Sequence, residues 1–257
     1  MTSQHYKYKK MQLNNSCLSS VADCLGGPYL IGDLRATCSR FSRVLPKATL
    51  FFTCPYDFEM WCCKTGELAP LRHYFFEGGV YHWFDSSYRA SKAGSSNVVH
   101  YMLNHLREPC NKMDGFFYGA ARGGQTELLL ELDAAYKSIF KSDPNMNMYA
   151  QTLYFAGRSG NYETCEAVMK LMGEPYAFNK MLLGASRGGH LELCKTAIGM
   201  GGTDIYTASR EAIGKDSVEV LDYFFTKCGL QRSEKPKLTS LAIAFKSPKT
   251  LEYLESL

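Results

Sequence analysis

The sequence lacks the features of secreted, membrane-spanning and strongly nucleic-acid-binding proteins. No stretch of its 257 residues approaches the roughly 18 to 20 continuous apolar residues that a transmembrane helix needs. Residues 1–10 are polar and basic, so we expect a flexible tail there and not a secretory signal. The net charge of +4 is too small to call for nucleic acid as a partner. We therefore expect a cytoplasmic or nuclear protein whose partners are neither membranes nor nucleic acids.

The ten cysteines contain no C-x-x-C pair, so neither a zinc motif nor a disulfide framework is predicted. Those that fall on apolar faces of predicted helices are Cys17, Cys24, Cys38, Cys165 and Cys194. We expect them to be reduced, buried thiols that act as small apolar side chains. The histidines without metal-ligand spacing to any cysteine are His73, His82, His100 and His105. No metal is expected.

Catalytic patterns are also missing from the sequence. No Ser-His-Asp or Cys-His arrangement can be assembled from it. Gly199, Gly201 and Gly202 follow a predicted helix, whereas a phosphate-binding loop lies between a strand and a helix. His190 and Glu192 fall at a helix start within the repeat described next. We therefore expect no enzymatic activity, no cofactor and no small-molecule substrate.

What the sequence does contain is a recurring phrase of five residues: two small residues, a basic residue, a variable residue and glycine. A polar residue and an apolar helix follow each copy. The clear copies are Ala90-Ser91-Lys92-Ala93-Gly94, Ala120-Ala121-Arg122-Gly123-Gly124, Ala156-Gly157-Arg158-Ser159-Gly160 and Ala185-Ser186-Arg187-Gly188-Gly189. Degenerate copies begin at residues 62, 212 and 242, so successive copies from 62 through 90, 120, 156, 185, 212 and 242 lie 27 to 36 residues apart. Such a period is typical of a stacked array.

Each phrase is predicted to join two helices. The glycine suits a left-handed helix C-terminus, because it has no Cβ to clash there. The polar residues expected to act as N-caps of the second helices are Glu67, Ser95, Gln125, Asn161, His190, Ser217 and Ser247. Apolar residues then recur at helical spacing, as in Val98-Val99 with Met102-Leu103. The predicted fold is an all-α solenoid of about seven helix pairs over residues 51–257, with the longest interruption at 141–148.

This phrase resembles the ankyrin repeat, whose core runs A-A-x-x-G-H-x-E-V-V-K-L-L-L. The copy most similar to it is Gly188-Gly189-His190-Leu191-Glu192-Leu193-Cys194-Lys195. The T-P-L-H opening of the family is absent, and Tyr88, Tyr118 and Tyr154 occupy its histidine position, where an aromatic ladder is expected. Divergent repeats of this kind look most like the ankyrin proteins of large DNA viruses. That resemblance implies a protein-interaction module that acts inside a host cell.

Residues 11–50 do not fit the repeat. Apolar positions 17, 18, 21, 24 and 25 predict an amphipathic helix, Gly26-Gly27-Pro28 ends it, and 30, 31, 34, 38 and 41 mark the next apolar face. This register resembles the F-box, although Asn14 and Ser16 replace its proline and acidic residue. The resemblance implies binding of a Skp-type adaptor through Leu13, Leu18, Val21, Leu25, Leu30 and Leu34. The alternative is a helical cap on the first repeat.

A column of basic residues occupies the third position of five successive phrases: Lys64, Lys92, Arg122, Arg158 and Arg187. Since packed helices lie about 8 to 10 Å apart, these charges should form a stripe. One interpretation is architectural, because cations complement a helix C-terminus and pair with glutamates of the next helix. The glutamates placed for such pairing are Glu127, Glu163, Glu192 and Glu219. The other interpretation is that the stripe also binds a target protein.

Together the two resemblances imply a substrate-recruiting adaptor of a cullin-RING ubiquitin ligase. Residues 11–50 would engage the Skp-type adaptor, and the solenoid would select an unknown target. The alternative is a structural or scaffolding ankyrin-repeat protein without a ligase, in which residues 11–50 cap the solenoid.

Overall fold

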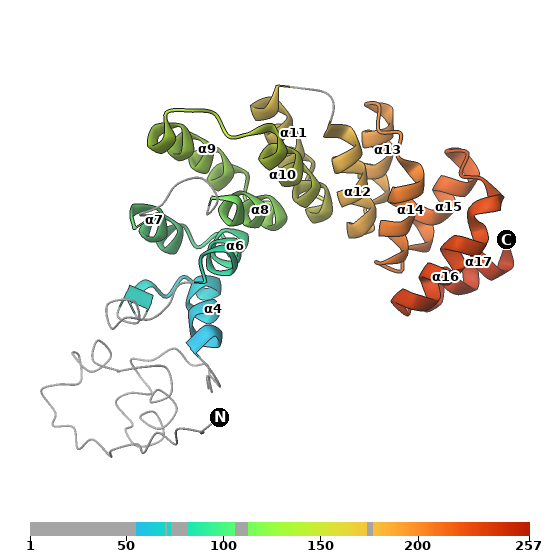
Figure 1. The fold of residues 1–257 in the computed structure, drawn as a ribbon, viewed down its shortest axis with the longest axis horizontal. Helices are drawn as coiled ribbons and strands as arrows, with labels where there is room; N and C mark the ends of the chain where they lie inside the picture. Colours follow the sequence, from blue (N-terminus) through green and yellow to red (C-terminus); the bar gives the residue numbers. More distant parts are fainter. Residues whose placement is uncertain (1–54, 70, 73–81, 106–112, 174–176) are drawn as a thin grey trace, which may run out of the picture. The chain divides into compact units, whose positions relative to one another are not determined.

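The structure, a computed structural model, describes residues 55–69, 71–72, 82–105, 113–173 and 177–257. Within these residues the chain is all-helical, with thirteen α-helices and one short 3₁₀-helix (Figure 1). The α-helices are α4 Pro55–Thr65, α6 Trp83–Ala93, α7 Ser96–Asn104, α8 Asp114–Gly123, α9 Thr126–Phe140, α10 Met146–Ser159, α11 Tyr162–Met172, α12 Phe178–Gly188, α13 Leu191–Gly199, α14 Ile205–Ile213, α15 Val218–Lys227, α16 Lys235–Phe245 and α17 Pro248–Ser256. None of the described helices is long and apolar enough to span a membrane. The predicted all-α class is confirmed.

The predicted tail over residues 1–10 and the F-box-like unit over 11–50 lie outside the described residues. The six adaptor-binding positions from Leu13 to Leu34 therefore stay predictions. The chain divides into two compact units, of which the second comprises residues 63–66 and 82–257. This second unit contains all of the helices from α6 to α17.

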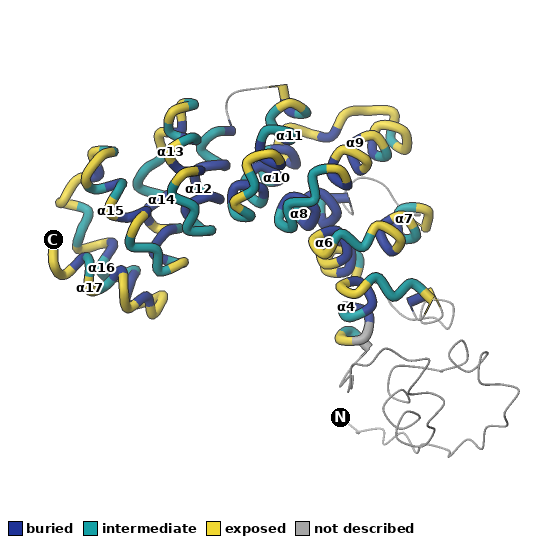
Figure 2. The backbone as a smooth tube through the Cα atoms, turned by 180° about the vertical axis from the view of Figure 1, so that it is seen from behind, coloured by how far each residue is buried: buried dark blue, intermediate teal, exposed yellow. Residues whose placement is uncertain are grey.

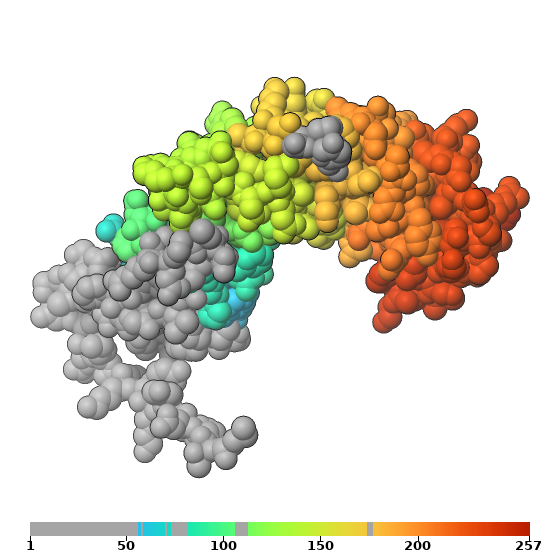
Figure 3. Space-filling view, turned by 45° about the horizontal axis from the view of Figure 1, so that its top comes forward, coloured from blue at the N-terminus to red at the C-terminus, as the bar shows by residue number. Residues whose placement is uncertain are grey.

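Within the second unit, consecutive helices form pairs from α6 with α7 to α16 with α17. The most extensive packing connects the first helices of these pairs in chain order, from α6 through α8 and α10 to α12, and the same row continues less extensively to α14 and α16. Between second helices the packing is sparser. In the space-filling view the colours of residues 113–257 follow one another without mixing (Figure 3). Each pair therefore packs on its neighbours in sequence, which is consistent with a helical repeat.

The reversal between the two helices of a pair uses the same backbone conformation in every phrase. The fifth residue has a positive φ in all seven copies: 67° to 83° at Gly66, Gly94, Gly124, Gly160 and Gly189, 61° at Asp216 and 54° at Lys246. In six copies the next amide donates to the carbonyl of the first phrase residue, as from Ser95 to Ala90 over 2.9 Å. In the remaining copy the Asn161 amide bonds the Ser159 hydroxyl. The predicted left-handed helix ends are confirmed.

The predicted N-cap residues begin the second helices, but most of them do not cap with their side chains. Only Asn161 does so among the described N-caps of these second helices, accepting a hydrogen bond from the Thr164 amide over 3.1 Å. The other side chains reach the preceding pair instead. The Gln125 amide lies against Gly94 and the His190 ring against Gly160, while the Ser247 hydroxyl donates to the Ile213 carbonyl over 2.7 Å. The capping interpretation was therefore wrong for these residues, which link consecutive pairs.

Glycine also allows the first helices to approach one another at backbone distance. A Cβ on Gly119 of α8 would lie 2.2 Å from the Tyr88 carbonyl oxygen of α6, and one on Gly184 of α12 would lie 2.0 Å from the Tyr154 carbonyl oxygen of α10. No side chain larger than hydrogen fits these contacts without moving a helix. As a result α8 is buried along most of its length, whereas the second helices α7 and α9 alternate between buried and exposed residues (Figure 2).

The second helices bury the apolar faces that the sequence predicted. Val98, Val99 and Met102 of α7 are fully buried, and the equivalent positions of α9 and α15 are buried in the same way. In α17 Thr250 and Leu254 are buried, while Leu251 is half-buried. Cys165 and Cys194 lie on such faces as free, fully buried thiols. Burial raises the pKa of Cys165 to about 12 and that of Cys194 to about 11. For these two cysteines the apolar interpretation is confirmed, while Cys17, Cys24 and Cys38 lie outside the described residues.

The longest spacing between phrases runs from residue 120 to residue 156, and its additional residues lie in longer helices and not in a longer loop. Helix α9 has 15 residues and α10 has 14. Only residues 141–145 separate them, as many as the residues 200–204 between α13 and α14. The prediction of the longest interruption at 141–148 was therefore wrong. Asn145 begins α10 early, because its side chain accepts a hydrogen bond from the Met148 amide over 2.7 Å.

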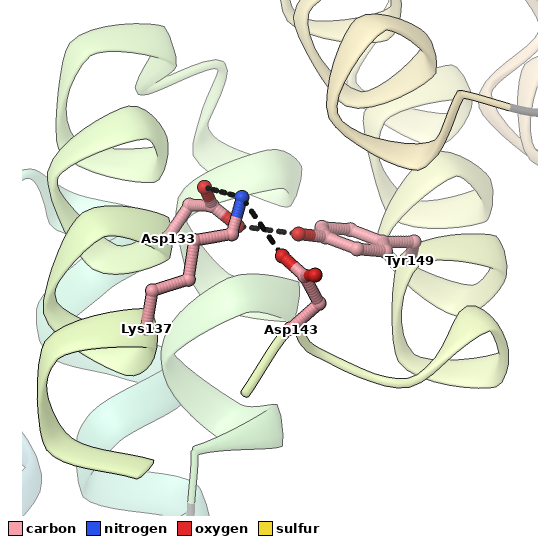
Figure 4. A network of polar contacts seen from close by, with 4 residues as sticks. All are labelled: Asp133, Lys137, Asp143 and Tyr149. Carbon is pink, nitrogen blue, oxygen red and sulfur yellow. Dashed lines mark hydrogen bonds and ion pairs between the residues drawn. The ribbon is translucent and has the colours of Figure 1, made fainter. Parts of the chain in front are cut away.

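A polar network holds α9, the 141–145 segment and α10 together (Figure 4). The Tyr149 hydroxyl donates to the buried carboxylate of Asp133. The Lys137 ammonium lies 3.0 Å from Asp133 and 3.1 Å from Asp143. Burial and the contact with Asp133 raise the pKa of Tyr149, which keeps its hydroxyl protonated as a donor. The buried charge of Asp133 is thus neutralised within the network.

Candidate recognition surface

The structure places the basic column where the sequence predicted it. Its five residues lie in the last turns of α4, α6, α8, α10 and α12, and all five belong to the second unit: Lys64, Lys92, Arg122, Arg158 and Arg187. Because α6, α8, α10 and α12 pack in this order, the four charges on them follow one another along the row of first helices. Lys64 is close enough to Lys92 to act on it electrostatically.

Part of the column interacts with the C-terminal end of the following first helix. Arg122 Nη1 donates to the backbone carbonyl of Arg158, in the last turn of α10, over 2.7 Å. The Arg187 guanidinium lies over Gly214, where a Cβ would come within 1.8 Å of it, and its Nε is 3.7 Å from the Glu211 carboxylate. These contacts support the architectural interpretation for Arg122 and Arg187, with the cation complementing a neighbouring helix C-terminus.

The predicted pairing of the column with glutamates of the second helices was wrong. Glu127, Glu163, Glu192 and Glu219 are all exposed. No ion pair between described residues joins any of them to the column, and Glu192 instead binds Lys195 of its own helix over 2.7 Å. All four lie in the first turns of the second helices. Glu211, which does pair with Arg187, lies on the first helix α14.

The three tyrosines at the histidine position of the repeat belong to one aromatic cluster but do not stack on one another. Phe155 is its centre, with ring centroids 5.9 Å from Tyr88, 5.1 Å from Tyr118 and 5.4 Å from Tyr154. Phe84 adds to it, 6.3 Å from Tyr118, and is 49% exposed. The predicted ladder is therefore a cluster around a residue that the sequence reasoning missed. In the sequence, the only indication that Phe155 belongs to this cluster is its position next to Tyr154.

Tyrosines and cations share one face of α6, α8 and α10. Tyr88 precedes Lys92 by four residues, and the same spacing relates Tyr118 to Arg122 and Tyr154 to Arg158. Positions i and i+4 of a helix are neighbours on its surface. This Tyr-x-x-x-Lys/Arg pattern is readable in the sequence and places the three tyrosines beside the basic column. We call the resulting surface the basic–aromatic face; it consists of Phe84, Tyr88, Lys92, Tyr118, Arg122, Tyr154, Phe155 and Arg158.

The cations of this face influence one another and the tyrosines. Burial and the charges of Arg122 and Arg158 lower the pKa of Lys92. Burial raises the pKa of Tyr88, while Arg122, Arg158 and Arg89 oppose that rise. The face therefore gathers like charges from three helices. Among the described residues, the Nε of Arg158 is buried without a hydrogen-bond partner.

Comparison with known proteins gives no family. No protein-family model matches the sequence, and no curated protein matches it either. The surface must therefore be interpreted from its own chemistry. Within the described residues no three His, Cys, Asp or Glu side chains gather as a metal site would require. The arrangement offers exposed rings beside guanidinium and ammonium groups, which can hold an anionic and partly apolar ligand.

Proposed function

We propose that this protein is a protein–protein interaction module built on ankyrin-like repeats. The observation that supports this most directly is the left-handed residue at the same phrase position in all seven copies, together with the sequential packing of the helix pairs. A repeated reversal presents equivalent side chains of successive pairs along one surface, which is how repeat proteins bind extended partners. The proposal assigns binding to the chain and no catalysis.

We further propose that the module recruits a target to a cullin-RING ubiquitin ligase. This step rests on the F-box resemblance of residues 11–50. In this function Leu18, Leu34 and the other apolar positions of that segment would contact a Skp-type adaptor, while the helix pairs bind the target. The alternative is a scaffolding protein without a ligase, in which residues 11–50 cap the repeats.

Co-purification tests the ligase proposal. The tagged full-length protein is expressed in cultured animal cells, and the Skp-type adaptor is sought in the purified material by mass spectrometry. Leu18→Asp and Leu34→Asp should each abolish recovery of the adaptor, because an unpaired charge would enter an apolar contact. Arg158→Gln, far along the sequence in α10, is the matched control and should retain the adaptor.

The cap alternative predicts a different pair of results. The wild-type protein would then yield no adaptor, and Leu18→Asp would lower the melting temperature followed by circular dichroism. Adaptor recovery that is lost in both leucine variants at unchanged melting temperature would exclude the cap.

A further inference from the structure

Three helices contribute cations to the basic–aromatic face, and among the described residues no ion pair joins Lys92, Arg122 or Arg158 to an acidic side chain. Burial and the charges of Arg122 and Arg158 lower the pKa of Lys92, and burial and the charge of Arg158 lower the pKa of Arg122. Two acidic side chains at the face are already engaged, Glu211 with Arg187 and Asp114 with the Tyr118 hydroxyl. Like charges gathered in this way repel one another, and an anionic ligand would relieve that repulsion.

The aromatic half of the face offers apolar surface beside these charges. Phe84 is 49% exposed, and Tyr88, Tyr118 and Phe155 are partly exposed. Tyrosine and phenylalanine in this setting are typical of the central contacts of protein interfaces. A ligand that combines carboxylates with apolar or aromatic side chains would use both halves.

The geometry favours a peptide over a nucleic acid. Phe84 stacks on Tyr88 with 13° between the ring planes, Tyr118 stacks on Phe155 with 28°, and Tyr88 meets Phe155 at 66°. These rings therefore cover part of one another, and of the four only Phe84 is exposed, so they leave few open ring faces on which successive bases could stack. Packed helices lie about 8 to 10 Å apart. Three residues of extended chain also cover about 10 Å. Carboxylates on every third residue of an extended peptide would therefore meet cations of successive helices.

We propose that the basic–aromatic face binds an extended acidic peptide segment of the recruited protein. Its carboxylates would contact Lys92, Arg122 and Arg158, and its intervening apolar side chains would pack on Phe84, Tyr88, Tyr118 and Phe155. This rests on the proposed interaction function and adds the chemical class of the target. Lys92 is the exposed cation of the three, so it is the most accessible to a carboxylate of the peptide. The guanidinium of Arg122 already donates one hydrogen bond, to the Arg158 carbonyl.

Fluorescence anisotropy on the full chain tests this assignment. The probe is a fluorescein-labelled peptide about twelve residues long, with glutamate at every third position and alanine or tyrosine between. Binding is measured at about 50 mM and about 300 mM NaCl, because salt screens these charges within a Debye length. Two further probes are a peptide of equal composition with its glutamates consecutive, and single-stranded polythymidine of similar length.

The spaced peptide should bind more tightly than the consecutive one, and its affinity should fall at high salt. Lys92→Glu should weaken it about tenfold, as should Arg122→Gln combined with Arg158→Gln. The matched control, Lys227→Gln with Lys249→Gln, removes two exposed cations from the second helices α15 and α17 and should leave binding unchanged. Lys92 is exposed, so its variant should fold even if the arginine pair destabilises the protein.

Equal weakening by the control pair, or tighter binding of polythymidine than of the spaced peptide, would overturn the peptide assignment. Failure here is distinct from failure of the ligase proposal. Peptide binding without adaptor recovery would retain the face and remove the ligase, whereas adaptor recovery without peptide binding would do the reverse.

Discussion

The fifth residue of each phrase carries the reversal between two helices, and two of the seven copies do so without glycine. Asp216 and Lys246 hold φ values of 61° and 54°, where a Cβ is unfavourable. Asp216 compensates through its carboxylate, which accepts hydrogen bonds from the Thr250 amide over 2.8 Å and the Thr250 hydroxyl over 3.1 Å. This caps the start of α17 from the preceding pair. Lys246 is exposed, and its part in the reversal is its left-handed backbone conformation.

Glycine should therefore have opposite effects at these two positions. Lys246→Gly should raise the free energy of unfolding by about 0.5 to 1 kcal/mol, because it relieves the left-handed conformation at an exposed site. Asp216→Gly relieves the same strain but removes the cap of α17, whose loss costs about 0.5 to 2 kcal/mol. Urea titrations of both variants measure the difference. Equal stabilisation by the two substitutions would show that the Asp216 contacts contribute nothing.

At the scale of the element, α8 packs on α6, and α12 on α10, through glycines that approach the backbone of the neighbouring helix. Gly115, Gly119 and Gly123 recur at every fourth position of α8 and face the backbone of α6. A Cβ on Gly123 would lie 2.2 Å from the Lys92 carbonyl oxygen. Backbone atoms cannot rotate aside as a flexible side chain can, so these contacts allow little adjustment.

An alanine scan of glycines separates this packing effect from backbone entropy. Gly119→Ala should destabilise the protein by about 1 to 3 kcal/mol, because α6 must shift to admit the methyl group. Gly199→Ala is the matched control at the end of α13, where nothing lies within 4 Å of the added Cβ. It should be neutral or stabilising by about 0.4 to 1 kcal/mol. Similar melting temperatures for the two variants would contradict backbone contact between α6 and α8.

Local sequence patterns predicted the helices and turns well. They did not predict the side-chain contacts between helix pairs. The glycine turns and the apolar faces of Val98 and Leu129 depend on residues within one helix pair, so spacing alone indicates them. The side chains of Gln125 and His190 act on the turn of the preceding pair. Arg122 likewise bonds a carbonyl 36 residues away. Such contacts depend on the register of stacking, which no single pair encodes.

For the candidate face, the sequence supplied the basic column and the tyrosines but not their combination. The position of Phe155, directly before the phrase, holds Arg89, Gly119 and Gly184 in the other clear copies, so periodicity could not single out an aromatic residue there. The predicted ion pairs with glutamates were wrong for another reason: the cations lie on the first helices and the glutamates on the second helices. At the scale of the whole molecule, the proposed binding surface lies on the row of first helices, and buried residues of both first and second helices form the core.

Two buried thiols link the stability of these faces to pH. Cys165 on α11 and Cys194 on α13 have pKa values raised to about 12 and about 11, in each case chiefly by burial. In the unfolded chain a cysteine thiol has a pKa of about 8.5. Because the folded pKa is the higher one, the stabilisation is fully present below the unfolded pKa and is lost as pH rises through the folded pKa.

The free energy of unfolding should therefore fall between about pH 8.5 and pH 10.5, by about 2 kcal/mol for each thiol. The Cys165→Ala, Cys194→Ala double variant should be less stable at neutral pH, because each substitution leaves a small cavity. Its stability should decline less steeply with pH, since alanine does not titrate. Urea unfolding of both proteins across this range measures the two slopes, and other groups that titrate there contribute equally to both. Parallel curves would mean that burial does not suppress ionisation of these thiols, and that the packing of α11 and α13 admits water where the structure shows an apolar face.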